Sequence, residues 1–284
     1  NVGSLDLDGD GNLEYTYIAA PPAVVDYDSD GDVDVAYFPV SVSYDPDAGT
    51  GTSANPGHSW IYKALLNSTS PSDLEWCEFY DPADGTVNEA DTGGGSTYAF
   101  GSRPEVYYAI TTAWMKSGEL GVYWGSGSPF LASSSTDDAA FFLMKDPDPL
   151  SCGSTAVALT CGSERGGFYA LEPGERLTDD PLVYAGSVYF ATYVPNSDTC
   201  EVGEGRLYAL NYLDCSPGWD SDGDGSASAA DDAYIAVEGY VSTPSIGLNG
   251  KLYYTGATDV DIQVVSAVDD PFHGTSTVGW MEMY

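Results

Sequence analysis

Short apolar runs, each bounded by turn residues, set the pattern of this 284-residue chain. The runs are rich in Val, Ile, Tyr and Phe, and clusters of Gly, Pro, Asp and Ser separate them. Apolar residues at helical spacing are almost absent, whereas β-branched and aromatic runs between turn clusters are typical of strands. The pattern therefore predicts an all-β fold.

The apolar runs recur in groups of four. Four such groups can be aligned, and they begin near residues 21, 103, 180 and 242. Repeated four-stranded units are typical of the blades of a β-propeller. We therefore expect a β-propeller with about four recognisable blades, either complete or part of a larger ring. A β-sandwich is the alternative fold, and the repeated strand groups count against it.

The groups are roughly 60 to 80 residues long, which is long for a propeller blade, so insertions are expected. Polar, glycine-rich segments at 83–99 and 216–232 fit this role and are expected at the surface. We assign residues 1–20 to an N-terminal segment with an acidic loop, and residues 21–284 to the propeller domain. The chain begins with Asn1 and shows no signal peptide, which indicates a processed or excised fragment.

Three aspartate-dense segments interrupt the apolar pattern. They are DLDGDGNLE at 6–14, DYDSDGDVD at 26–34 and DSDGDGSASAAD at 220–231. Two like charges 4 Å apart repel by about 1 kcal/mol in water and about 4 kcal/mol at an effective dielectric constant of 20. A divalent cation reverses this repulsion, and Ca²⁺ takes about six to eight oxygen ligands. The three segments therefore predict calcium-binding loops that hold two to three ions.

The longest of these segments fits the twelve-residue EF-hand pattern, with aspartate at the last position where glutamate is usual. A short helix is expected to follow it, over 229–236, whereas the two shorter loops close at their ninth position and can connect strands directly. The predicted ligands are Asp220, Asp222, Asp224, Ser226 and Asp231; Asp26, Asp28, Asp30, Asp32 and Asp34; and Asp6, Asp8, Asp10, Asn12 and Glu14. Ser226 and Asp32 are expected to bind through their backbone carbonyls.

Metal-free turns, and metals other than calcium, fit the acidic loops less well. A solvated Asp/Gly turn accounts for one such cluster better than for three. Magnesium demands tight octahedral geometry and keeps several waters, and zinc and copper prefer His and Cys ligands. The chain has only two histidines, His58 and His273, and they are far apart in the sequence.

Charge and cysteine content narrow the class of protein. The chain has 44 acidic and 8 basic residues, a formal net charge of -36, so neither nucleic acid nor an anionic membrane is an expected partner. No run approaches the roughly 20 apolar residues of a membrane-spanning helix.

The cysteines form no metal-binding motif. Two local disulfides, Cys152–Cys161 and Cys200–Cys215, fit an oxidising, extracellular compartment and leave Cys77 as a buried thiol.

The chain carries no recognisable catalytic motif. A nucleophile elbow, a P-loop and a dinucleotide-binding glycine motif are all missing from the sequence. A carboxylate pair for glycoside hydrolysis cannot be singled out among so many acids. We therefore expect no catalytic residues and no enzymatic activity.

Several segments together are similar to a known family. They are VVDYDSDGDVDVAYF, ELGVYWGSGSP, GFYALEPGERLTDDPLVYAGSVYFATYVPNSDTC, GRLYALNYLDC and TVGWMEMY. Residues 21–284 resemble the C-terminal propeller of PilY-type biogenesis factors and tip adhesins of type IV pili.

The resemblance implies an extracellular, calcium-binding β-propeller that supports pilus assembly, retraction control and surface attachment. Its calcium loop maps onto Asp26, Asp28, Asp30, Asp32 and Asp34. The loops at 6–14 and 220–231 lie outside the family pattern, and the family's large N-terminal adhesion region has no counterpart here. The implied partners are pilus or surface-filament proteins, or further copies of this chain.

Two alternative functions are compatible with the sequence. One is a structural subunit of an extracellular filament or surface layer that calcium stabilises. The other is a quinoprotein-like dehydrogenase, because the Tyr-Ala-Leu strand motif is similar to repeats of those enzymes. Quinoproteins surround their cofactor with basic groups, and the scarcity of arginine in this chain counts against that function.

Overall fold

The computed structural model describes residues 4–5, 14–42, 58–66, 74–80, 105–115, 118–127, 139–161, 165–196, 200–219, 232–247, 251–256 and 263–266. All regular elements within these ranges are β-strands, and all strand pairings are antiparallel. The prediction of an all-β fold is confirmed. No helix in these ranges is long and apolar enough to cross a membrane.

The first sheet contains β1 (Ser4–Leu5), β2 (Glu14–Tyr17), β3 (Ala23–Val25), β4 (Val35–Val42), β5 (His58–Leu65) and β6 (Glu75–Tyr80). The strands β4 and β5 pair over their whole length. Both β2 and β3 pair with β4, one toward each of its ends. The main part of the sheet is therefore a four-stranded meander whose first strand is in two pieces.

The second sheet contains β7 (Thr111–Trp114), β8 (Leu120–Gly125), β9 (Ala140–Asp146), β10 (Val157–Ala158) and β13 (Phe168–Ala170). Here the last strand is the divided one, because β10 and β13 pair with opposite ends of β9. A two-stranded ribbon of β11 (Thr160–Cys161) and β12 (Arg165–Gly166) lies between these two pieces in the sequence.

The third sheet contains β14 (Arg176–Leu177), β15 (Leu182–Tyr184), β16 (Ser187–Val194), β17 (Glu204–Asn211) and β18 (Tyr234–Glu238). It repeats the arrangement of the first sheet, since β14 and β15 pair with opposite ends of β16. The fourth sheet contains β19 (Ser245–Ile246), β20 (Lys251–Tyr254) and β21 (Gln263–Ser266).

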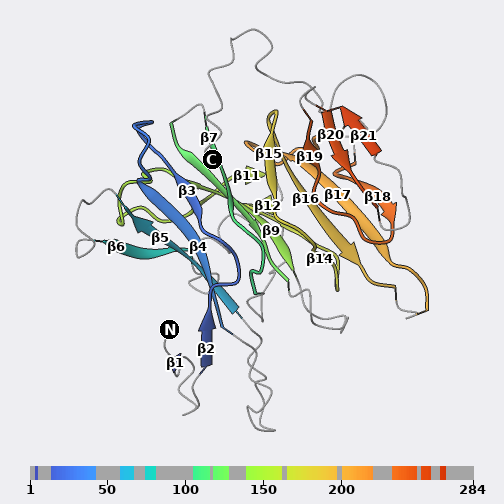
Figure 1. The fold of residues 1–284 in the computed structure, drawn as a ribbon, viewed down its shortest axis with the longest axis horizontal. Helices are drawn as coiled ribbons and strands as arrows, with labels where there is room; N and C mark the ends of the chain where they lie inside the picture. Colours follow the sequence, from blue (N-terminus) through green and yellow to red (C-terminus); the bar gives the residue numbers. More distant parts are fainter. Residues whose placement is uncertain are drawn as a thin grey trace.

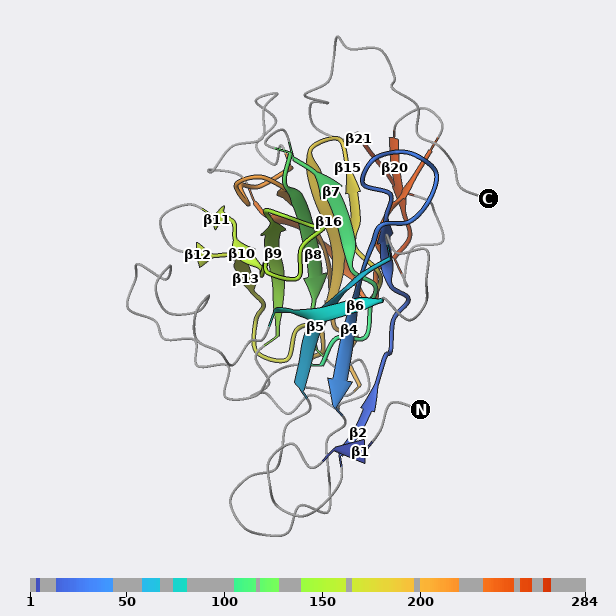
Figure 2. The same ribbon diagram turned by 90° about the vertical axis from the view of Figure 1, so that its left-hand side faces the viewer.

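The four sheets follow one another in chain order and lie side by side (Figure 1). The view from the side of the first sheet shows β4, β5 and β6 in front of the strands of the second and third sheets (Figure 2). Each junction between successive sheets has its own apolar core. Side chains of the sheets therefore lie either in a core between two successive sheets or on the outer face of the first or last sheet.

Alternation of side chains along the central strands explains how one strand serves two cores. Phe142 on β9 packs toward the first sheet with Trp124, whereas its neighbour Phe141 stacks on Phe190 of the third sheet, with ring centroids 3.9 Å apart. Successive residues of a strand point to opposite faces. A strand covered on both faces therefore needs a continuous apolar run, such as AFFLM of β9, rather than an alternating one.

The structure differs from expectation around the 220–231 segment. The short helix expected over 229–236 is not formed in the described part, because Tyr234–Glu238 is strand β18 and pairs with β17. Pairing with an existing strand outweighs the weak helix preference of the alanines beside it. Trp219, placed within the predicted insertion, is buried, and its indole N–H donates to the Leu207 carbonyl at 3.1 Å.

Both predicted disulfide pairings are wrong. Cys77 on β6 is bonded to Cys152, with their Cα atoms 5.7 Å apart and a sequence separation of 75 residues. Cys215 also belongs to a disulfide, while Cys200 is an exposed thiol. The pairing follows from packing of the first sheet against the second, and local sequence spacing carries no information about that contact.

Candidate metal site

The acidic loop at 26–34 connects β3 to β4 at the edge of the first sheet. The sheet holds both ends of the loop. The Asp34 N–H donates to the Val25 carbonyl at 2.9 Å, and the Leu66 N–H donates to the Asp34 carbonyl at 2.6 Å. These bonds continue the β3–β4 and β4–β5 ladders, so the apolar strands on either side fix the position of the loop.

The loop turns sharply because two of its residues have positive φ angles. Ser29 has φ 62° and Gly31 has φ 98°. A side chain at position 31 would meet no atom within 4 Å, so glycine is favoured there by its backbone conformation rather than by lack of space. The turn folds the aspartates before it back toward the aspartates after it.

Three carboxylates converge inside this turn. Asp26, Asp28 and Asp34 each offer an oxygen, and these oxygens lie within 4.8 Å of one another. The carboxylates of Asp26 and Asp34 are partly buried, and Asp28 is exposed. A cluster of carboxylate oxygens at the edge of a strand fits the ligand preference of a hard divalent cation.

The same carboxylates accept backbone hydrogen bonds that hold the turn together. Asp26 accepts from the Gly31 N–H at 2.9 Å, and Asp34 accepts from the Tyr27 N–H at 2.7 Å. The other two predicted ligands, Asp30 and Asp32, lie outside this cluster. Asp30 uses a carboxylate oxygen to accept from the Asp32 N–H at 2.9 Å, and Asp32 is exposed. The structure therefore brings together three of the five predicted ligands of this loop through their side chains.

The surroundings of Asp28 raise the pKa of its carboxyl group. Desolvation first, and then the carboxylates of Asp30, Asp34 and Asp26, raise the pKa of the Asp28 carboxyl above its ordinary value. A backbone hydrogen bond from Asp30 partly opposes this rise. A cation bound among these groups would relieve the same repulsion that raises the pKa.

An aromatic contact ties the loop to the second sheet. Tyr27, between two of the clustered aspartates, meets Trp114 of β7 edge to face, with ring centroids 5.1 Å apart. The loop therefore lies at the junction of the first two sheets, and ordering the loop also orders that junction.

The other predicted metal ligands lie outside the described residues. These are Asp6, Asp8, Asp10 and Asn12 of the first loop and Asp220, Asp222, Asp224, Ser226 and Asp231 of the third. The backbone of Glu14 is described as the first residue of β2. For these two loops calcium binding stays a prediction from sequence.

A second oxygen-rich loop, Asp146–Ser154, was not found from the sequence. It begins at the last residue of β9, and its oxygens surround the ammonium group of Lys63 from β5. Lys63 donates to a carboxylate oxygen of Asp146 at 2.8 Å and to the Ser151 carbonyl at 2.6 Å. The Ser154 and Asp148 carbonyls lie at 3.2 and 3.3 Å. The side chains of Lys63 and Asp146 are both fully buried.

The Asp146 carboxylate is saturated with hydrogen bonds. The Tyr37 hydroxyl donates to the oxygen that also accepts from Lys63, at 2.8 Å. The other oxygen accepts from the Ser154 hydroxyl at 2.7 Å and from the Asp148 N–H at 3.1 Å. Burial and the Asp146 charge raise the pKa of the Tyr37 hydroxyl far above its ordinary value, so this tyrosine stays a donor. A buried ion pair is tolerated when its remaining lone pairs are satisfied in this way.

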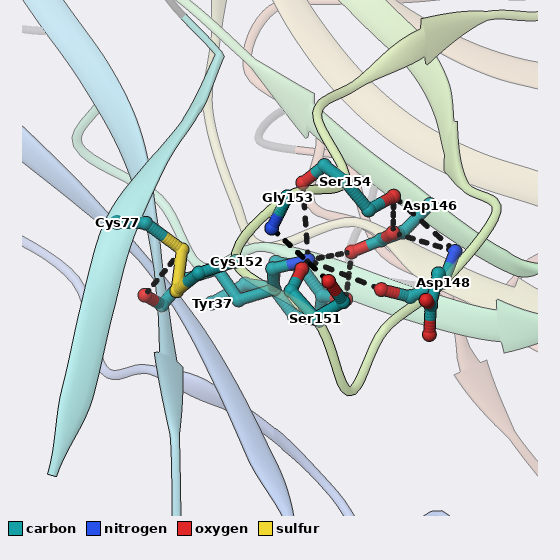
Figure 3. The surroundings of a disulfide bond; sticks show 9 residues. Tyr37, Cys77, Asp146, Asp148, Ser151, Cys152, Gly153 and Ser154 are labelled. Carbon is teal, nitrogen blue, oxygen red and sulfur yellow. Dashed lines mark hydrogen bonds and ion pairs between the residues drawn. A yellow bond between two sulfur atoms is a disulfide. The ribbon is translucent and has the colours of Figure 1, made fainter.

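The Cys77–Cys152 disulfide lies beside this ion pair (Figure 3). Cys152 follows Ser151, whose carbonyl accepts from Lys63. The first and second sheets are thus joined twice at one place, by a covalent bond and by a buried ion pair. A signal for the pair exists in the sequence, since Lys63 stands inside an apolar strand, but its partner could not have been named from it.

A second buried cation occupies the third sheet. Arg206 on β17 pairs with Glu172, Glu175 and Glu204 at 3.1, 3.0 and 2.7 Å. Its guanidinium also lies over the ring of Tyr234, 4.6 Å from the ring centre. The protein therefore holds one of its own arginine side chains between an aromatic ring and several carboxylates.

Comparison of the chain with protein-family models, with curated proteins and with solved structures finds no match.

Proposed function

We propose that this chain is an extracellular, calcium-binding β-propeller module that acts in type IV pilus assembly, pilus retraction or surface adhesion, without enzymatic activity. Calcium orders the 26–34 loop and thereby stiffens the junction between the first two sheets. A stiffened junction presents a fixed surface to a pilus or surface-filament protein. The resemblance of residues 21–284 to PilY-type proteins supports the pilus role.

The observation that carries the proposal is the convergence of Asp26, Asp28 and Asp34 within 4.8 Å. Three carboxylates this close repel one another, and desolvation together with the neighbouring carboxylates raises the pKa of Asp28. A divalent ion turns this unfavourable arrangement into a binding site. The family resemblance, which rests in part on these aspartates, assigns its calcium loop to the same segment.

The order of the sheets supports the propeller part of the proposal. Three successive chain segments each form a four-stranded antiparallel meander, with the first or last strand divided. Each meander packs on the next through its own core. Face-to-face packing of successive four-stranded meanders is the construction principle of propeller blades.

The disulfide supports an extracellular location. Disulfides persist in oxidising compartments, and Cys77–Cys152 joins two sheets that are distant in sequence.

Calcium titration calorimetry tests the metal site. The expected result is that Asp28→Ala lowers the number of bound calcium ions by one, because it removes one of three convergent carboxylates. Asp32→Asn is the matched control from the same loop, since its side chain lies outside the cluster and its carbonyl is unchanged. An unchanged stoichiometry in Asp28→Ala contradicts the proposed site.

The pilus role needs a separate test in cells that produce this chain. We expect the chain to co-purify with sheared type IV pili in calcium and to be lost from them in EGTA. Pili that carry none of the chain under either condition contradict the pilus role and leave the metal site standing.

A further inference from the structure

The outward face of the first sheet is unusually aromatic. Antiparallel sheets with one wet face normally alternate apolar and polar residues. On β4 and β5 the residues Tyr37 and Ile61 point into the first core, and their neighbours Phe38 and Tyr62 point the opposite way. The alternation expected of a solvated face is therefore missing from both strands.

Three rings cross this face as a stripe. Phe38 and Tyr62 stack with centroids 6.1 Å apart, and Tyr62 lies 5.5 Å from Trp76 of the edge strand β6. Phe38 and Tyr62 are partly buried, but Trp76 is 64% exposed, the largest value among the large apolar side chains of the described residues. We call Phe38, Tyr62 and Trp76 the aromatic stripe. Its outer end presents an indole ring to solvent at the edge of the sheet.

A carboxylate flanks the exposed end of the stripe. Glu78 on β6 is exposed and stands directly across from Tyr62 in the strand register, on the same face as the stripe. Glu75 pairs with Leu65 of the first core, so it lies on the opposite face of the strand. The acidic loop lies at the same end of the sheet, because Leu65 pairs with Glu75 and the next residue along, Leu66, donates to the Asp34 carbonyl.

The same ingredients bind a cation elsewhere in this protein. In the third sheet, Tyr234 and three glutamates hold the guanidinium of Arg206. Guanidinium groups stack on aromatic faces and pair with carboxylates through a planar fork, which an ammonium group cannot do. The net charge of -36 attracts basic partners and repels acidic ones.

We propose that the aromatic stripe, with Glu78, is a docking surface for an arginine-bearing segment of a partner protein. An arginine side chain stacks on the indole of Trp76 while its guanidinium pairs with a flanking glutamate. The acidic surface steers the basic segment toward the site. This proposal is independent of calcium binding at the 26–34 loop.

A peptide with six arginines separated by serines is the probe, and calorimetry at about 0.15 M salt, where surface charges are strongly screened, measures its affinity. Trp76→Ala is expected to weaken binding by about two- to fivefold, the value of one exposed cation–π contact, without changing the charge of the protein. Tyr240→Ala is the matched control, because Tyr240 is also an exposed aromatic side chain (47%) but follows β18 of the third sheet and lies outside the stripe. Its affinity should match that of the unaltered protein.

A Glu78→Gln variant tests the carboxylate and keeps the proposal falsifiable should Trp76→Ala fail to fold; Glu75→Gln, on the opposite face of the same strand, is its matched control. Glu78→Gln is expected to weaken the arginine peptide more than a lysine peptide of the same length. Equal weakening by Trp76→Ala and Tyr240→Ala overturns the proposal. Three other results also overturn it: no binding at this salt concentration, Trp76-dependent binding of a neutral oligosaccharide in place of the peptide, and Trp76-dependent self-association of the protein.

Discussion

Two oxygen-rich loops meet the junction of the first and second sheets, and they differ in where their positive charge comes from. The Asp146–Ser154 loop receives the ammonium of Lys63, which is part of the chain. The 26–34 loop gathers three carboxylates and has no basic side chain among the groups described around it. The first loop is neutralised by a side chain of the protein, and among the described groups the second is not.

The difference explains why the charged pair of one loop is fully buried and the carboxylates of the other are not. Removing a charge from water costs several kcal/mol unless a partner and hydrogen bonds replace the lost solvation. Lys63 and Asp146 satisfy that condition with Tyr37, Ser154 and the surrounding carbonyls, so the pair can be fully buried. The clustered carboxylates of the 26–34 loop have no basic partner among the described residues, and they are only partly buried or exposed.

The largest expected effect comes from removing Lys63, the internal cation of the buried pair. Lys63→Met is expected to lower the free energy of unfolding by about 3–5 kcal/mol, because it leaves the buried Asp146 carboxylate without its countercharge. Urea unfolding monitored by tryptophan fluorescence measures this change.

Lys145→Met is the matched control for that variant. Lys145 pairs with Glu119 at 2.8 Å, but both side chains are partly exposed, so the expected loss is at most about 1 kcal/mol. In Lys63→Met/Asp146→Leu both charges are gone, and most of the lost stability should return. Equal losses for Lys63→Met and Lys145→Met would show that burial of the pair does not matter.

Removing the disulfide beside the ion pair is the next largest change. Cys77→Ser/Cys152→Ser is expected to lower the free energy of unfolding by about 2–4 kcal/mol, since the bond closes a long segment of chain. Cys200→Ser, at an exposed thiol, should change it by less than about 0.5 kcal/mol. Differential scanning calorimetry with and without a reductant provides the measurement. Equal melting temperatures in both conditions would contradict a structural role for the bond.

The smallest expected effect concerns protons at the 26–34 loop. The pKa of Asp28 is raised, so its carboxyl takes up a proton more readily in the folded protein than in the unfolded chain. Without metal, stability from this group is present at low pH and is lost as the pH rises through the raised pKa. Calcium needs the deprotonated form, so its affinity should fall as the pH falls through the same pKa, by up to about tenfold per pH unit.

Calcium titrations between pH 7 and pH 4 check this sign. Asp28→Asn should bind calcium more weakly at pH 7 and show a smaller pH dependence, because the titrating group is gone. An affinity that is constant over this range, or that rises on acidification, contradicts a site built on Asp28.

Much of the fold could be predicted from the sequence, because strands can be recognised from short stretches of consecutive residues. Apolar runs such as LGVYWG and AFFLMKD, bounded by turn residues, became β8 and β9 as expected. The turn chemistry of Asp26–Asp34 was equally readable, since Gly31 and alternating acids are local features. The helix expected over 229–236 failed because pairing of Tyr234–Glu238 with β17 outweighed local preference.

The partners of Lys63 and Cys77 could not be predicted, because both contacts join segments more than 70 residues apart. The aromatic stripe was likewise hidden, since its three rings come from three strands whose register only pairing defines.

The sequence by itself determined the all-β class, the strand positions and the acidic turn at 26–34, because each depends on residues within a few positions of one another. Only the tertiary structure decided which charges are buried, which cysteines pair and which aromatic rings reach the surface. The physical reason is that burial is a property of the packed sheets. Lys63 and Lys145 are the same residue in similar strands, and only the loop that closes over Lys63 makes it part of the interior.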